Sequence, residues 1–324
     1  MRINFHFSSI CAAAVLMMGP SAQADTYPSK SVKIVVPYGT GGGSDILARQ
    51  IGAGLQQLWG QGVVVDNRAG ASGNIGTSEV VRAPSDGYTL LLQNSTMVTN
   101  LGLTGKLPYD PEKDLTPIML LGVTPIALAA HPSANVSNAK ELIAAAKAKP
   151  DALSYGSCGI GTPQHFVMEL VKQQSGMEAA HAGYKGCAPA LTDLLGGQIP
   201  LAIVSANLVA PYAKNGRLKA IGVSTASRYS SMPETPTFEE QGLKPFDFSI
   251  WFALMGPKNL PPAVVSKLAA DVSTVLAQPS VISNLSNAGV ERLKGTGEDL
   301  TKLIRLDTKR YTDLAKSANI KAEK

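Results

Sequence analysis

Two glycine-rich segments, each directly before an expected helix, contain the residue types that bind anions. The first is VVPYGTGGGSDILARQIG, from Val35 to Gly52, and the second is SYGSCGIGTPQHFVMEL, from Ser154 to Leu170. The N–H groups of a first helical turn have no intrahelical partner, and the helix dipole adds partial positive charge there. Glycines let an anion approach these donors closely. A plain strand-to-helix turn also uses glycine, but four glycines within residues 39–43 exceed what a turn needs. We therefore predict an anion site.

Other polar residues follow expected strands and extend this candidate site. Ligands of open α/β sheets bind outside the carboxyl ends of the strands, and QNSTMV, YKGCAP and VSANL stand at such positions. For any single Ser or Asn among them, helix capping is the competing interpretation. The candidate ligand-binding residues are Tyr38, Gly39, Thr40, Gly41, Gly42, Ser44, Asp45, Asn94, Ser95, Ser157, Cys158, Gly159, Thr162, His165, Tyr184, Ser205 and Asn207.

Nucleotide binding, catalysis and metal binding have less support in the sequence. A dinucleotide fingerprint needs a glycine where Ser44 stands, and no lysine completes a phosphate loop. Cys158 and His165 are close enough in sequence to form the thiolate–imidazole pair of a hydrolase, but no third, orienting group is evident. The histidines lack metal-ligand spacing, so we expect no metal, no cofactor and no catalytic residue. Whether Cys158 and Cys187 form a disulfide stays open, although an oxidising compartment would permit it.

Alternating strands and helices must hold these loops in place. The strand VKIVVP leads to the helix SDILARQIGAGLQQLWG, and the same alternation restarts after residue 130. Strands separated by helices of this length are βαβ units, which predict an α/β fold with a mixed sheet flanked by helices. The restart predicts two lobes. Residues 25–124 plus 226–324 are expected to form the first, and residues 125–225 the second.

The N-terminal residues read as an export signal. Arg2 precedes the apolar run ICAAAVLMM, which is too short to span a bilayer, and SAQA follows, ending at Ala24. We expect cleavage near Ala24 and a periplasmic mature chain. Ile10 stands where a lipoprotein signal needs a small residue, which disfavours lipidation of Cys11. The net charge of +5 is spread along the chain without basic runs or interleaved aromatics, so nucleic acid is not an expected partner.

Long segments of the chain resemble the substrate-binding proteins of tripartite tricarboxylate transporters, also called Bug-type receptors. The resemblance covers essentially the whole mature chain. The segments that carry it are YPSKSVKIVVPYGTGGGSDILAR, VVVDNRAGASGNIGTSEVVRAPSDGYTLL, YGSCGIGTPQHFVMEL, YKGCAPALTDLLGGQIPLAI, NGRLKAIGVSTASRYSSMPETPTFEEQG and WFALMGPKNLPPAVV.

This resemblance implies a two-lobed periplasmic binding protein of type II, the Venus flytrap type, that closes on a small solute. The implied ligand is an organic carboxylate, held by backbone N–H groups and hydroxyls of the two glycine-rich loops. The implied partner is a membrane permease with large and small subunits, and a monomeric receptor is expected. A sensor that presents its ligand to a signalling receptor is the alternative role.

The chain departs from the family pattern at a few positions. Tyr38-Gly39-Thr40 stands where the family often has PFPPGGG, and Cys158 and Cys187 replace the usual Ala or Gly. The family commonly has an acidic or polar residue near Val204, where this chain is apolar. A more apolar wall would favour a bulkier acid, so an aromatic or dicarboxylic acid such as terephthalate is the ligand hypothesis.

Overall fold

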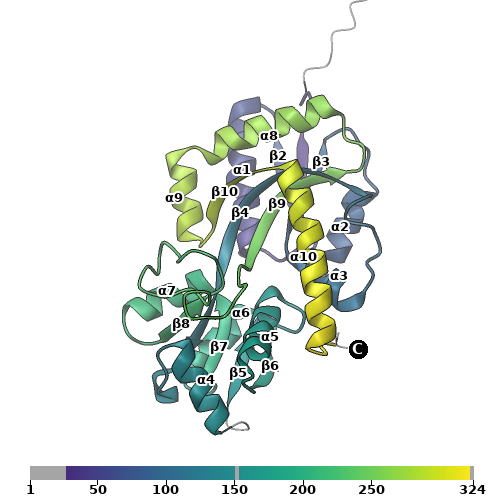
Figure 1. Cartoon of the computed structure of the whole chain (residues 1–324). Coiled ribbons are helices and arrows are strands. Elements are labelled where there is room, and N and C mark those ends of the chain that lie inside the picture. The colour runs from purple at the N-terminus through teal and green to yellow at the C-terminus, as the bar shows by residue number, and fades with distance from the viewer. Residues whose placement is uncertain (1–26, 150–152, 322–324) are drawn as a thin grey trace, which may run out of the picture.

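The chain folds into two α/β lobes that share one long strand (Figure 1). The computed structural model describes residues 27–149 and 153–321, and the expected signal peptide at residues 1–24 lies outside them. Within these residues the strand order is β2-β1-β3-β9-β4-β7-β5-β6, with β10 and β8 also pairing with β4. The two-lobed α/β fold predicted from the sequence is confirmed.

The first lobe has a mixed sheet in which β1 pairs with β2 and β3 in parallel. β9 is antiparallel to both β3 and β4, and β10 is antiparallel to β4. The strands are β1 (Val32–Val36), β2 (Val63–Asn67), β3 (Thr89–Asn94), β4 (Leu115–Ala130), β9 (Ser249–Pro257) and β10 (Glu291–Thr296). The helices are α1 (Gly43–Trp59), η1 (Ala71–Gly73), α2 (Asn74–Val81), α3 (Thr96–Thr104), α8 (Pro262–Leu276), α9 (Pro279–Asn287) and α10 (Gly297–Ser317).

The second lobe repeats the design on a smaller sheet. β5 is parallel to β6 and β7, and β4 is antiparallel to β7 and β8. The strands are β5 (Ser154–Ser157), β6 (Ala180–Gly183), β7 (Leu201–Ser205) and β8 (Lys219–Val223). The helices are η2 (Pro132–Ala134), α4 (Ala139–Ala148), α5 (Pro163–Ser175), α6 (Cys187–Leu195) and α7 (Ala206–Lys214).

The chain passes between the lobes within β4 and again next to β9. Pro125 still pairs with β9, whereas Ile126 pairs with β7. Ser224 ties this crossing together, because its Oγ accepts from the Ile126 N–H at 3.1 Å and donates to the Phe248 carbonyl. Residues 226–248 were expected in the first lobe, yet Phe238 and Phe246 pack into the core of the second. We therefore propose that the first lobe resumes near Ser249.

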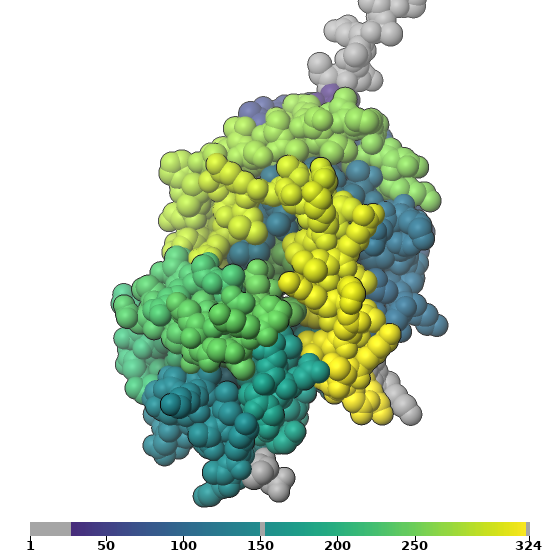
Figure 2. Space-filling view, viewed as in Figure 1, coloured from purple at the N-terminus to yellow at the C-terminus, as the bar shows by residue number. Residues whose placement is uncertain are grey.

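Helices cover both faces of each sheet. Ile34 and Val36 of β1 pack in one core cluster with α1 and α8, whereas Val35 packs in another with α3 and α10. Successive strand residues point to opposite faces, so burial on both faces explains the uninterrupted apolar runs of the sequence. Figure 2 shows α10 (yellow) extending from the first lobe towards the second, where Tyr311 packs edge-on against Phe166 of α5 with ring centroids 5.0 Å apart.

Candidate functional site

A cavity of about 700 Å³ lies between the two lobes, at the strand ends of both sheets. The first lobe contributes the loop before α1, the start of α3, part of β9 and the end of α9. The second lobe contributes the starts of α5, α6 and α7. The lining residues are Tyr38, Gly39, Gly41, Gly42, Gly43, Ser44, Ile46, Asn94, Thr96, Thr124, Cys158, Thr162, Pro163, Gln164, Gly186, Cys187, Ala188, Ser205, Asn207, Leu208, Ile250, Phe252, Asn287 and Ala288.

Several helix N-termini meet at this cavity. The first turns of α1, α3, α5, α6 and α7 all contribute lining residues. The caps of α1 and α6 are Gly42 and Gly186, and neither end has a side-chain cap hydrogen bond. Within the described chain the lining includes no Asp, Glu, Lys, Arg or His. Backbone N–H groups at these helix starts therefore bring partial positive charge to the cavity wall, which suits an anion.

The loop before α1 is shaped by Asp45, whose carboxylate faces the protein and not the cavity. Asp45 accepts from the Gly41 N–H at 2.9 Å and pairs with Arg49 at 2.9 Å, and only 4% of its surface is exposed. Burial acts to raise the pKa of Asp45, but hydrogen bonds from Arg49, Gly41 and Asn67 outweigh it and hold this pKa below its ordinary value. Asp45 is therefore a loop anchor, contrary to its predicted place in the site.

Asn94 connects this loop to the start of α3. Its Nδ2 donates to Ser44 Oγ at 3.1 Å, and its Oδ1 accepts from the Thr96 N–H at 2.8 Å. Tyr38 stands beside them and donates its hydroxyl to Gln93 Oε1, and burial raises the pKa of Tyr38 so that it stays neutral. This part of the first-lobe wall is thus polar, uncharged and fixed by hydrogen bonds.

The second glycine-rich loop satisfies most of its own donors. Thr162 Oγ1 accepts from the His165 N–H, and the Gly161 N–H donates to His165 Nδ1 at 3.2 Å. The Gly159 N–H donates to Ser157 Oγ, which lies 2.7 Å from His181 Nε2. This loop offers fewer free N–H groups than the sequence suggested, because its own side chains occupy them.

A stacked histidine pair lies beneath this loop. The rings of His165 and His181 are 3.9 Å apart between centroids and nearly parallel. Burial, with His181 and Lys172 nearby, lowers the pKa of His165 to about 3. His165 is therefore neutral near pH 7, which lets its Nδ1 accept the Gly161 N–H.

The predicted site residues divide into two groups. Those that line the cavity are Tyr38, Gly39, Gly41, Gly42, Ser44, Asn94, Cys158, Thr162, Ser205 and Asn207. Those that the structure places elsewhere are Thr40, Asp45, Ser95, Ser157, Gly159, His165 and Tyr184. Ser95 and Ser157 are fully buried, Thr40 is exposed on the loop, and the Tyr184 hydroxyl donates to Asp193 at 2.7 Å.

Among the other lining residues, Gly43, Thr96 and Gly186 lie in the segments that the sequence singles out. Gln164 lies close to the predicted Thr162 and was missed, although a wider interpretation of the same loop would include it. Phe252 on β9 and Asn287 at the end of α9 carry no local signal. Only the tertiary fold brings them to the cavity.

Cys158 and Cys187 form a disulfide in the second-lobe wall, which settles the question left open by the sequence. The bridge ties the loop before α5 to the first residue of α6. Because the Cys158 thiol is consumed, it is not the thiolate nucleophile that the hydrolase alternative required.

The apolar part of the wall does not come from Val204. That side chain is fully buried in a core cluster with Ala190 and Leu194 of α6, so the argument built on it was wrong. Phe252, Ile250 and Leu208 supply the apolar surface instead.

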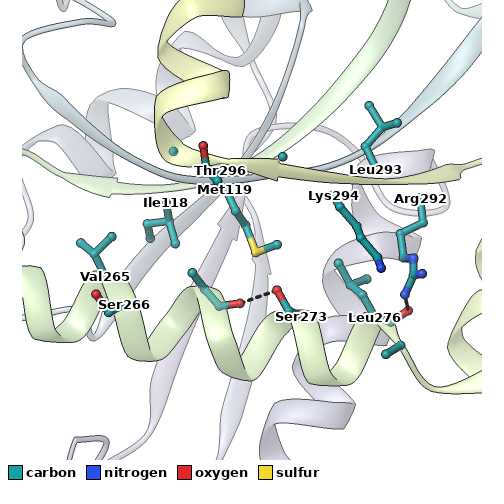
Figure 3. Close-up of a pocket in the computed structure, with 14 residues that line it drawn as sticks. Ile118, Met119, Val265, Ser266, Ser273, Leu276, Arg292, Leu293, Lys294 and Thr296 are labelled. Carbon is teal, nitrogen blue, oxygen red and sulfur yellow. Dashed lines mark hydrogen bonds between the residues drawn. The ribbon is translucent and has the colours of Figure 1, made fainter.

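A second cavity, of about 660 Å³, lies between α8 and β10 within the first lobe (Figure 3). Arg292 donates to the Leu276 carbonyl there at 2.8 Å, and Val265 and Met119 line an apolar side. The nearby start of α10 is closed by a capping box between Thr296 and Asp299. Because it lies in one lobe and offers no open helix end, this groove is a weaker candidate for an anion.

The described residues contain no cluster of His, Cys, Asp and Glu that could hold a metal ion. Among the helices that they form, none is long and apolar enough to cross a bilayer.

Comparison with known proteins gives consistent results. Residues 47–320 match the family model described as tripartite tricarboxylate transporter family receptor. R. palustris Rpa4515 with adipate is 33% identical, with a TM-score of 0.80 over 91% of this chain and 99% of that one. The periplasmic binding protein BugD is 32% identical, with a TM-score of 0.77 over 92% and 100%. MatC from Rhodopseudomonas palustris with bound malate is 28% identical, with a TM-score of 0.76 over 89% and 99%.

Proposed function

The chain belongs to the tripartite tricarboxylate transporter receptor family, whose members are periplasmic solute-binding receptors and not enzymes, and we propose that it holds a small organic carboxylate in the inter-lobe cavity. The observation that carries this proposal is the set of helix N-termini at a cavity whose lining, over residues 27–149 and 153–321, has no acidic or basic side chain. A helix end stabilises a nearby negative group by about 0.3–2 kcal/mol. Several of them acting together supply a large part of the ~8 kcal/mol behind a micromolar dissociation constant.

A dicarboxylate fits this arrangement because helix ends face the cavity from both lobes. One carboxylate would lie at the uncapped start of α1, near Ser44. The other would lie at the starts of α6 and α7, near Gly186 and Ser205. Adipate and malate, the ligands of the two related proteins, are both dicarboxylates.

An aromatic diacid such as terephthalate is the finer proposal. Phe252, Ile250 and Leu208 give the cavity an apolar side on which a ring could pack. This support is independent of Val204, on which the hypothesis first rested.

We further propose that ligand binding closes the lobes and that the closed form is delivered to a membrane permease with large and small subunits. A ligand that touches both lobes favours the closed state by its differential affinity. The receptor would act as a periplasmic monomer after removal of the signal peptide near Ala24.

Calorimetric titration of the purified mature protein tests this function. The panel is adipate, malate, terephthalate, citrate and glutamate, with adipamide as the uncharged analogue of adipate. We expect at least one diacid to bind and to raise the melting temperature, and adipamide to have no effect. Absence of binding by every acid would refute the proposal, and equal binding of adipamide would refute its electrostatic basis.

A further inference from the structure

The start of α7 and the end of α9 meet in the wall of the cavity. Asn207, in the first turn of α7, donates its Nδ2–H to the carbonyl of Ala288 at 3.2 Å. Ala288 is the residue that ends α9. The carbonyls of a last helical turn have no intrahelical partner and carry partial negative charge. The second lobe therefore supplies a hydrogen-bond donor to a helix end of the first.

The following residue, Gly289, allows this close approach. Its φ of 77° lies in the left-handed region, and a Cβ built there would stand 2.1 Å from the Cβ of Asn207. The Gly289 carbonyl accepts from Thr124 Oγ1 at 2.9 Å. Further along the same seam, Ser230 Oγ donates to Glu291 Oε1 at 2.7 Å. The lobes thus touch through a contact that leaves no room for a side chain at residue 289.

This contact also bears on the charge of the cavity. Asn287 and Ala288 line it, so α9 presents a C-terminal end, with partial negative charge, to a space that several helix N-termini also line. An unsatisfied carbonyl there would repel an anion. Asn207 and Ala288 belong to different lobes, so separating the lobes would break the hydrogen bond that covers this carbonyl.

We propose that Asn207 is the closure latch of this receptor: it caps α9 across the cleft, holds the lobes together and shields the bound anion from the α9 carbonyl. The part that concerns the anion rests on the proposed function, whereas the part that concerns lobe closure does not. Apparent affinity scales with the fraction of molecules that are closed. Loss of one hydrogen bond of this kind should reduce the ratio of closed to open molecules, and with it the apparent affinity, by about 2- to 10-fold.

Lobe closure is measured without ligand by pulsed spin-label distances. The labels are placed at Ala144→Cys on α4 and Ala270→Cys on α8, which are both exposed. Gly289→Ala forces a side chain against Asn207, and Asn207→Ala removes the donor without adding strain. Gly216→Ala is the matched control, because Gly216 has a φ of 76° and open space around its Cβ.

We expect longer distances in Gly289→Ala and Asn207→Ala than in the wild type, and unchanged distances in Gly216→Ala. Wild-type distances in both of the first two variants would overturn the latch, whether or not any carboxylate binds.

Adipate titration then tests the electrostatic part. Asn207→Asp places a negative charge in the cavity wall and should lower the affinity for adipate more than Asn207→Ala does. Equal affinities of the two variants would overturn the electrostatic part of the proposal. Failure of the wild type to bind any acid would count against the proposed function alone.

Discussion

Replacing both Cys158 and Cys187 with serine should destabilise the second lobe and weaken ligand binding. The bridge spans a sequence separation of 29 residues. Closing a loop of that length in the unfolded chain corresponds to about 3.6 kcal/mol in the chain-entropy model. At about 2–4 °C per kcal/mol, the melting temperature should fall by roughly 7–14 °C. Affinity should fall as well, because the bridge fixes the start of α6 against the loop before α5 in the cavity wall.

The measurement must report on the second lobe itself. Trp59 and Trp251 both lie in the first lobe, so tryptophan fluorescence would miss the change. Urea unfolding followed by circular dichroism gives the global effect, and hydrogen exchange over residues 154–205 gives the local one. The serine variant, and the wild type reduced with a dithiol, should both exchange faster there than the oxidised wild type. An unchanged unfolding midpoint in both samples, or faster exchange confined to β1–β3, would refute the reasoning.

Two further predictions concern the loops around the cavity. The pKa of His165 is lowered from 6.5 to about 3 on folding, so the unfolded chain binds an extra proton between these values and stability is lost as the pH falls below 6.5. The loss of stability from this group is about 1.4 kcal/mol per pH unit. Between pH 7.5 and 4.5 the melting temperature of the wild type should therefore fall more than that of His165→Gln. Identical pH profiles of the two proteins would contradict this prediction. Asp45→Asn should lower the free energy of unfolding by about 1–3 kcal/mol because it weakens the bonds to Gly41 and Arg49. The control Asp313→Asn alters an exposed ion pair with Lys309 and should change the free energy of unfolding by less than about 1 kcal/mol. Equal losses of the two variants in urea unfolding would show that Asp45 does not anchor the loop.

The first glycine-rich loop was predictable because its function is local. A strand that ends before Gly39 and a helix that begins at Gly43 place the open N–H groups regardless of the rest of the fold. The same holds for the starts of α6 and α7. By contrast, Phe252 and Asn287 reach the cavity only because β9 returns antiparallel beside β4 and α9 packs near α1. No short-range pattern marks them.

The interpretations of the second loop and of β7 could have been refined from the sequence. Thr162 followed by Pro163 and His165 has the composition of a self-capped helix start, and Thr162 does accept from the third residue of its helix. Val204 follows Ala202 at a spacing of two, so both face the same side of β7, where α6 covers them. The disulfide, by contrast, could not be predicted from the sequence, because the distance between two glycine-rich loops depends on the tertiary structure.

A wall of helix ends suits a receptor that must release its ligand. A buried arginine would have to lose its hydration at a penalty of several kcal/mol, and it would regain this only in a well-formed ion pair. Backbone dipoles at the starts of α1, α6 and α7 are already fixed by the fold, so no free charge is left behind when the anion leaves. The same reasoning explains why the α9 carbonyl needs a partner. Because no described lining residue carries an ionised side chain, the partial charge of a single uncovered carbonyl matters for the bound anion. Asn207 covers the Ala288 carbonyl from the other lobe, and opening of the lobes would uncover it.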